Sequence, residues 1–149
     1  MPYPELMVEP MREELRRLGF AELKTPEDVD REVTSSPEPL LLVVNSVCGC
    51  AAGVARPGVA LSLRHPAAPK RLATVFAGQD VEATARARSY FENHPPSSPQ
   101  IAILARGRLL YLLQRQEIEG RMPDQIALAL SGAYDQIART VTAAAAVDS

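Results

Sequence analysis

The sequence contains no tryptophan, and aromatic residues make up only 5% of its 149 residues. Surfaces that stack nucleic-acid bases depend on aromatic side chains, so this composition argues against such a surface. Basic residues are not in excess either, because 16 lysines and arginines stand against 18 acidic residues. The formal net charge of -2 gives no positive field to attract phosphates. We therefore expect no nucleic-acid partner.

Long apolar runs are absent as well. No window approaches the roughly 18 apolar residues that a membrane-spanning helix needs, so we expect no membrane partner. The first residues, MPYPELMVEPMREEL, lack the basic start and apolar centre of a signal peptide, which predicts a cytoplasmic location. Hydrophobic residues nevertheless reach 46%, which is typical of a globular protein. We interpret residues 1–149 as a single domain.

Cysteine is scarce, and the only two cysteines lie one glycine apart in the stretch VVNSVCGCAAG. In a reducing compartment such a pair is typical of catalytic, redox-sensing or metal-binding sites rather than of structural disulfides. Cys48 follows an apolar run and precedes an alanine-rich, helical segment. Free backbone N–H groups at the start of that helix would favour the thiolate form of the cysteine. The stretch therefore predicts thiol–disulfide exchange.

The spacing of the two cysteines predicts a strained disulfide. Inside a regular helix, two steps turn the chain by about 200°, so the two side chains would point apart. A Cys48–Cys50 bond therefore requires Cys48 to stand outside the helix, with Gly49 giving the backbone freedom to bend. Strain raises the reduction potential, so we expect a more oxidising disulfide than the Cys-x-x-Cys of thioredoxin, at about -270 mV.

The rest of the chain alternates between apolar runs and amphipathic periods. A helix is expected over residues 7–18, with Pro10 kinking or opening it, and Thr25 is the expected cap of a short second helix. Pro57 is expected to kink the helix after the cysteines, and Asp80 to cap the next one. Apolar runs predict four strands, at residues 40–44, 72–77, 100–104 and 109–113. Composition and periodicity predict three more helices, at residues 51–65, at 81–91 and from 123 onward.

This order, with a cysteine motif after the first strand and a proline directly before the third, is that of the thioredoxin fold. We predict an α/β, thioredoxin-like fold with a central four-stranded mixed sheet, helices on both faces and extra N-terminal helices. In such folds a cis proline faces the cysteines and leaves the backbone before it free to pair with a substrate. Ser98 and Pro99 match that position, so we expect a cis bond there and a substrate-binding surface.

Other polar residues near the motif have alternative interpretations. Asn45 and Ser46 either hydrogen-bond the thiolate or hold the turn. Arg56 either adds positive potential near the thiolate or is a solvated surface charge. His94 lies in the loop that leads to Pro99, but a lone loop histidine usually has no chemical role. The charged residues of the 81–91 helix, Glu82, Arg86 and Arg88, are interpreted as a solvated face.

The chain resembles the bacilliredoxin family, small thioredoxin-like proteins with a Cys-Gly-Cys motif. The resemblance runs through most of the chain, in the order PMREEL, GFAELKT, VVNSVCGCAAGVARP, VFAGQDVEATARARSYF, PSSP and EIEG. It implies a reductase of mixed disulfides between protein cysteines and bacillithiol, with Cys48 as the attacking nucleophile and Cys50 as the candidate resolving thiol. It also implies no bound cofactor, a low-molecular-weight thiol such as bacillithiol as co-substrate, and bacillithiolated or disulfide-bonded proteins as clients.

Three other interpretations stay open. The family is also described as having weak general oxidoreductase or protein disulfide isomerase activity. The fold could instead serve only to bind a partner, in which case the Cys48 thiol should have an ordinary pKa. A third alternative is a metal carrier that uses both thiolates. Zinc favours four ligands, however, and the only histidines, His65 and His94, have no spacing typical of a known site, so we expect no metal.

Overall fold

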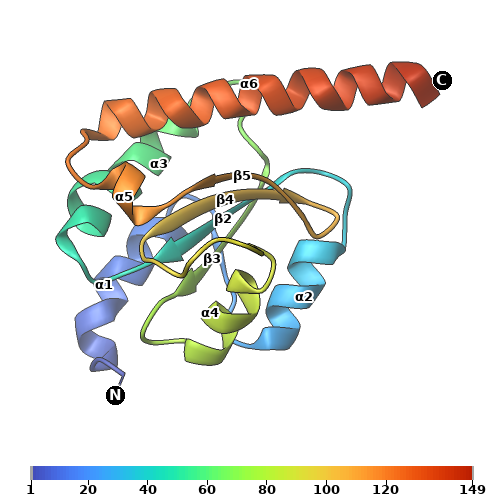
Figure 1. Ribbon diagram of the computed structural model, residues 1–149. Helices are drawn as coiled ribbons and strands as arrows, with labels where there is room; N and C mark the ends of the chain where they lie inside the picture. The colour runs from blue at the N-terminus through green and yellow to red at the C-terminus, as the bar shows by residue number, and fades with distance from the viewer. Residues whose placement is uncertain (1, 149) are drawn as a thin grey trace.

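The structure is a computed structural model that describes residues 2–148, with side chains as far as Thr140. Strands and helices are mixed along the chain, and Figure 1 shows a central sheet with helices on both sides and a long last helix across one face. The elements are α1 (Glu5–Arg16), β1 (Ala21–Glu22), α2 (Pro26–Thr34), β2 (Leu40–Asn45), the π-helix η1 (Ala51–Ala55), α3 (Arg56–Ser62), β3 (Arg71–Phe76), α4 (Val81–Arg88), β4 (Gln100–Ala105), β5 (Arg108–Leu113), α5 (Arg115–Ile118) and α6 (Pro123–Asp148).

The sheet has five strands in the order β1-β3-β2-β4-β5, so the expectation of four strands is wrong by one. The first three are parallel to one another, β4 runs antiparallel to β2, and β5 runs antiparallel to β4. The extra strand, β1, is only two residues long and pairs Ala21 with Ala73 of β3. Two residues form no apolar run, and this strand exists because the edge of β3 offers it hydrogen-bond partners.

The central strand β2 explains why helices cover both faces. All six of its residues are buried, and successive side chains point to opposite sides of the sheet. Leu41 and Val43 pack with residues of α3 and α6, whereas Leu42 and Val44 pack with residues of α2 and α4. The predicted helices on both faces are confirmed, and the cysteine motif leaves the most buried strand of the sheet.

The N-terminal helices follow the sequence expectations with one exception. Thr25 caps α2, because its hydroxyl accepts a hydrogen bond from the backbone N–H of Asp28 at 3.1 Å. Pro10 lies inside α1, which begins at Glu5, so the alternative in which this proline opens the helix is wrong. The helix instead starts five residues before Pro10, with acidic Glu5 in its first turn, where negative charge is favourable.

Two helix starts differ from the predictions. The segment after the cysteines first widens into a π-helix, and α3 then begins with Pro57 in its first turn, where a missing N–H is tolerated. Asp80 precedes α4, but its side chain makes no capping hydrogen bond. Its carboxylate instead pairs with both terminal nitrogens of Arg12, at 2.8 and 3.0 Å, and this stronger partner displaces the cap.

The two edges of the sheet are both irregular. One edge is β1, with its two residues. The other is β5, whose pairing with β4 shifts register between Ile103 and Leu104. Within residues 2–148, no helix combines the length and apolar character that crossing a bilayer requires.

Candidate active site

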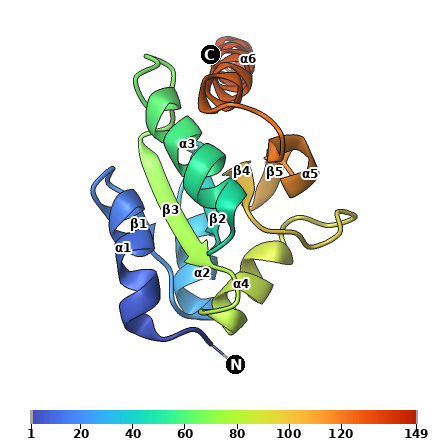
Figure 2. The ribbon, with the colours of Figure 1, turned by 90° about the vertical axis from the view of Figure 1, so that its left-hand side faces the viewer.

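The cysteine motif lies in a tight turn between β2 and the π-helix. Cys48 sits in a bend outside the helix, and its carbonyl oxygen accepts hydrogen bonds from the N–H groups of Ala51 and Ala52, at 3.1 and 3.2 Å. The expectation that Cys48 stands outside the helix is confirmed. Figure 2 shows this helix start beside α5 and the loop that leads into β4. Three segments far apart in the sequence therefore meet at the motif.

Asn45 and Ser46 hold this turn from its N-terminal side. The Asn45 amide donates to the carbonyl oxygen of Met11 in α1 at 3.1 Å, and its oxygen accepts from the Ser46 N–H at 2.9 Å. The Ser46 hydroxyl in turn accepts from the backbone N–H of Cys48 at 3.2 Å. Of the two roles considered for them, both residues hold the turn, and Ser46 also contacts the cysteine.

Arg56 is part of the same turn. Its side chain is 5% exposed, and its guanidinium donates to Asn45 Oδ1 at 2.9 Å and to the Ser46 carbonyl oxygen at 3.0 Å. It also forms an ion pair with Glu14 of α1. The interpretation as a solvated surface charge is therefore wrong, because the guanidinium is buried and its hydrogen bonds hold the turn that carries Cys48.

The two thiols are partly exposed and in contact with each other. Their Sγ atoms are 2.9 Å apart, and both cysteines are reduced. The strained Cys48–Cys50 disulfide therefore stays a prediction. Between them, Gly49 has no left-handed backbone angle, and a Cβ added there would meet nothing within 4 Å. The reduced site thus makes no steric demand for glycine at this position.

Their surroundings shift the pKa values of the two thiols in opposite directions. Partial burial acts to raise the pKa of Cys48, but hydrogen bonds from the Cys50 thiol and the Ser46 hydroxyl act against it. With the Ala51 N–H and the charge of Arg115, they lower the pKa of Cys48 below its ordinary value. Burial, and then the hydrogen bond and charge of Cys48, raise the pKa of Cys50 to about 11. Of the two thiols, Cys48 therefore loses its proton first as the pH rises.

The loop before β4 faces the motif. The Ser98–Pro99 peptide bond is cis, which confirms the sequence expectation. The carbonyl oxygen of Ser98 lies 3.9 Å from the Cys48 Sγ, while Pro99 is buried. Arg88 of α4 donates to the carbonyl oxygen of Ser97 at 2.7 Å. The structure thus brings Ser98 and Pro99 to the cysteines, on a loop that α4 holds in place.

The start of α5 supports this loop from the other side. The buried Gln114 accepts a hydrogen bond from the Ser97 hydroxyl at 2.7 Å. Next to it, Arg115 donates to the Ser98 carbonyl oxygen from Nη1 at 3.4 Å and pairs with Glu119 at 2.7 Å. Arg115 is therefore the cation beside both thiols, the place that the sequence interpretation considered for Arg56.

Sequence reasoning did not identify Arg88, Gln114 or Arg115 as part of the site. The interpretation of Arg88 as a solvated charge is wrong, because its side chain is partly buried against the loop. A signal for α5 did exist, since Gln114 and Glu117 form a reciprocal capping box directly after β5. That signal would have placed Arg115 at a helix start, but not beside the cysteines.

The histidines lie apart from the thiol contacts. His94 is exposed in the loop before Pro99, and its backbone N–H donates a hydrogen bond to the Phe91 carbonyl oxygen. His65 pairs with Asp135 of α6 at 2.7 Å. Among the described residues, no group of three or more His, Cys, Asp or Glu side chains is placed to hold a metal ion.

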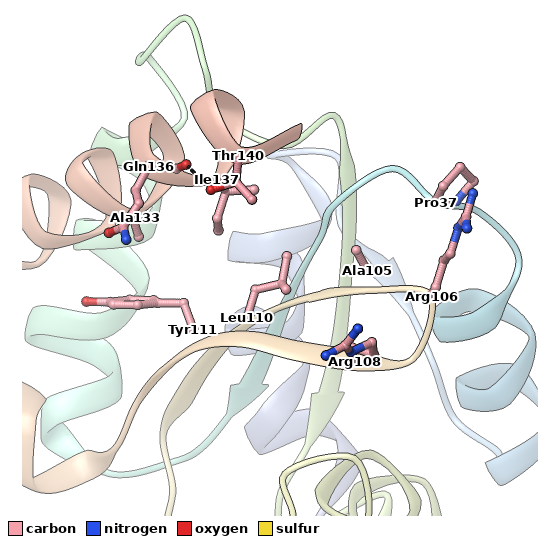
Figure 3. A pocket seen from close by; sticks show the side chains of 10 residues that line it. All are labelled: Pro37, Ala105, Arg106, Arg108, Leu110, Tyr111, Ala133, Gln136, Ile137 and Thr140. Carbon is pink, nitrogen blue, oxygen red and sulfur yellow. Dashed lines mark hydrogen bonds between the residues drawn. The ribbon is translucent and has the colours of Figure 1, made fainter. Parts of the chain in front are cut away.

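A hollow of about 500 Å³ lies between β5 and α6. Figure 3 shows Leu110 and Tyr111 of β5 on one side of it and Ala133 and Ile137 of α6 on the other. Neither cysteine lines this hollow, so it is separate from the thiol site.

Comparison with known sequences gives close relatives over most of the chain. The family described as "Disulphide isomerase" matches residues 3–138. A bacilliredoxin of Koribacter versatilis is 53% identical over 134 residues, which span 90% of this chain and 92% of that protein. Bacilliredoxins of Cytophaga hutchinsonii and Halalkalibacterium halodurans are 50% and 48% identical over 91% and 90% of this chain, and 99% and 93% of theirs.

Comparison with solved structures identifies the fold. A protein described as having a thioredoxin fold matches with a TM-score of 0.57 at 13% identity, over 74% of this chain and 91% of that chain. Thioredoxin O2 from Arabidopsis thaliana, in its oxidized state, matches with a TM-score of 0.50 at 14% identity, over 77% and 94%. The predicted thioredoxin-like α/β fold is confirmed, with the added fifth strand.

Proposed function

Because the chain belongs to the bacilliredoxin family of thiol–disulfide oxidoreductases, we propose that it removes bacillithiol from mixed disulfides on protein cysteines. In this proposal Cys48 is the attacking thiolate and Cys50 the resolving thiol. Ser98 and Pro99 form the surface against which the substrate disulfide lies. Bacillithiol, or another low-molecular-weight thiol, is the co-substrate, no cofactor is bound, and the clients are bacillithiolated or disulfide-bonded proteins of the cytosol.

The first step is attack by the Cys48 thiolate on the bacillithiol sulfur of the mixed disulfide. A bond forms between these two sulfur atoms, the original disulfide breaks, and the client cysteine leaves as a thiolate. The lowered pKa of Cys48 supports this assignment, because the thiolate is the reactive form. In this proposal the substrate backbone pairs with the backbone at Ser98, and the 3.9 Å between the Ser98 carbonyl oxygen and the Cys48 sulfur supports that placement.

The second step is attack by Cys50 on the Cys48 sulfur, which releases bacillithiol as a thiolate and leaves a Cys48–Cys50 disulfide. Before the first step, the hydrogen bond and negative charge of Cys48 help to hold the pKa of Cys50 at about 11. Once Cys48 carries bacillithiol, that negative charge is gone and Cys50 loses its proton more readily. The first step therefore prepares the second, and a two-electron reductant such as a dithiol, or two free thiols, returns the protein to its dithiol form.

One observation carries this proposal. The two thiols are 2.9 Å apart at the start of a helix, and their pKa values are shifted in opposite directions. A partner-binding module needs no such asymmetry, whereas a nucleophile with its resolving thiol does.

The test uses the Cys50→Ser variant with a protein that carries bacillithiol on a single cysteine, and mass spectrometry of both proteins. We expect bacillithiol to leave the client and to appear on Cys48, because no resolving thiol remains to release it. The Cys48→Ser variant is the matched control and should leave the client modified. Persistence of the modified client in the presence of Cys50→Ser would contradict the assignment of Cys48.

A second candidate function is protein disulfide isomerase activity, which the description of the matching family favours. Isomerisation needs the same nucleophile but a protein disulfide as substrate, and it needs no net reduction. Refolding of a protein with scrambled disulfides, under conditions without bacillithiol, measures it directly. Wild-type rescue of such a protein, together with failure to accept bacillithiol, would put isomerisation first.

A further inference from the structure

Arg115 is placed where it can meet a second part of a substrate that reacts at Cys48. Its Nη1 and the Cys48 Sγ both contact the carbonyl oxygen of Ser98, at 3.4 and 3.9 Å. The guanidinium therefore lies one carbonyl group away from the attacking sulfur. Its positive charge contributes to the lowered pKa of Cys48 and opposes part of the rise in the pKa of Cys50.

This guanidinium also keeps unused capacity for hydrogen bonds. The side chain is 44% exposed, Nε is engaged by Glu119 at 2.7 Å, and the contact of Nη1 with Ser98 is long. Among the described residues, Nη2 has no hydrogen-bond partner. The planar guanidinium fork is suited to bind a carboxylate with two parallel hydrogen bonds.

We propose that Arg115 binds a carboxylate on the low-molecular-weight thiol of the mixed disulfide, so that the site selects anionic thiols. This inference rests on the proposed function and adds the chemical class of the thiol to it. A carboxylate two carbons from the sulfur, as in 3-mercaptopropionate, reaches Arg115 while its sulfur is under attack by Cys48. A cationic thiol such as cysteamine meets the same charge as repulsion.

The experiment uses one client protein with a single cysteine, loaded in turn with 3-mercaptopropionate, 2-mercaptoethanol or cysteamine. In the Cys50→Ser background, the rate at which each thiol appears on Cys48 is followed by mass spectrometry. The quantity compared between variants is the ratio of the anionic to the cationic rate, since differences in intrinsic disulfide reactivity cancel in that comparison.

We expect Arg115→Gln to lower this ratio about fivefold, the size of a partly exposed ion pair. Loss of Arg115 also raises the pKa of Cys48, but that effect slows all three thiols alike and leaves the ratio unchanged. Arg115→Lys should retain part of the preference, because the charge stays while the fork is lost. An unchanged ratio in Arg115→Gln would overturn the inference.

Glu119→Gln gives an independent test in the opposite direction. This change frees Arg115 from its carboxylate partner, so the preference for the anionic thiol should rise about twofold. Arg108→Gln is the matched control, because Arg108 is an exposed arginine at the far end of β5 and should leave the ratio unchanged. Transfer of none of the three thiols would overturn the charge preference, whereas the proposed function fails only if the client loaded with bacillithiol also stays modified.

Discussion

The parallel strands β2 and β3 end side by side, where Asn45 pairs in register with Phe76, and each leads through a short turn into a helix. We call these turns the β2 junction, residues 46–50, and the β3 junction, residues 77–80. After β3, the acidic residue before the helix is fully paired, since Arg12 binds Asp80 through two hydrogen bonds and is 3% exposed. After β2, the corresponding place holds a partly exposed thiol. The same strand-to-helix geometry thus carries a stabilising ion pair at the β3 junction and an accessible thiol at the β2 junction.

Helix α1 contacts both junctions. Within one turn of this helix, the Met11 carbonyl oxygen binds Asn45, Arg12 binds Asp80 and Glu14 pairs with Arg56. At the β3 junction, Arg12 binds the side chain of Asp80 itself, the residue directly before the helix. The partners of the β2 junction fix only the backbone around Cys48, so its sulfur keeps room for a substrate. The turn that carries Cys48 is thus held through its backbone, while the Cys48 thiol itself stays partly exposed beside Cys50.

The largest effect should come from replacing the sulfur of Cys48 at the β2 junction. Cys48→Ser should reduce thiol transfer to the uncatalysed level, because a serine hydroxyl stays protonated at neutral pH. The free energy of unfolding of the reduced protein should change by less than about 1 kcal/mol, because the side chain is partly exposed. Transfer rates and urea unfolding curves check the two halves, and a large loss of stability would show that this junction is structural.

Removing the ion pair of the β3 junction should lower stability instead. Arg12→Met removes the buried cation and leaves Asp80 unpaired in a nearly buried place, at a cost of about 3–5 kcal/mol in the free energy of unfolding. Arg16→Met on the same helix is the control, since Arg16 is 33% exposed and its ion pairs should be worth less than about 1 kcal/mol. Equal losses in the two variants would remove the distinction.

The glycines of the two junctions offer a finer test. Gly78, before α4, has a φ of +80°, whereas Gly49 has no left-handed angle and open space at its Cβ position. Gly78→Ala should therefore cost about 1–2 kcal/mol of unfolding free energy, and Gly49→Ala less than about 0.5 kcal/mol in the reduced protein. Thermal unfolding of both variants under reducing conditions measures the difference, and a costly Gly49→Ala would refute the open geometry.

The smallest effect concerns the pKa of Cys48 at the β2 junction. Ser46→Ala removes a hydrogen bond that lowers the pKa of Cys48, so the pKa rises and less thiolate exists at any pH below it. The alkylation rate of Cys48 by iodoacetamide at pH 7 should fall about threefold. In alkaline solution, above the pKa of Cys48 in both proteins, the two rates should converge. A uniform decrease at every pH would instead indicate lost access to the sulfur.

The predicted parts of the fold and site depend on local signals. The unbroken apolar run of β2, the capping residue Thr25 and the cis proline after Ser98 each follow from a few neighbouring residues or from their order along the chain. The placing of Cys48 outside the helix follows from spacing alone.

The missed parts depend on partners far away in the sequence. Strand β1 is defined by its pairing with β3, and Asp80 loses its capping role to Arg12, 68 positions earlier. Arg115 lies 17 residues after Ser98 and on a different element, so no local pattern separates it from other surface arginines. Arg56 was placed correctly near the motif, but its burial depends on Glu14 and Asn45.

The irregular sheet edges have a consequence for behaviour at high concentration. A flat, regular edge strand invites another copy of the chain to pair with it and so promotes aggregation. Here one edge has only two residues, and the other carries a register shift between Ile103 and Leu104. Strand addition is therefore disfavoured at both sides of the sheet. We therefore expect the protein not to polymerise through its sheet even at high concentration.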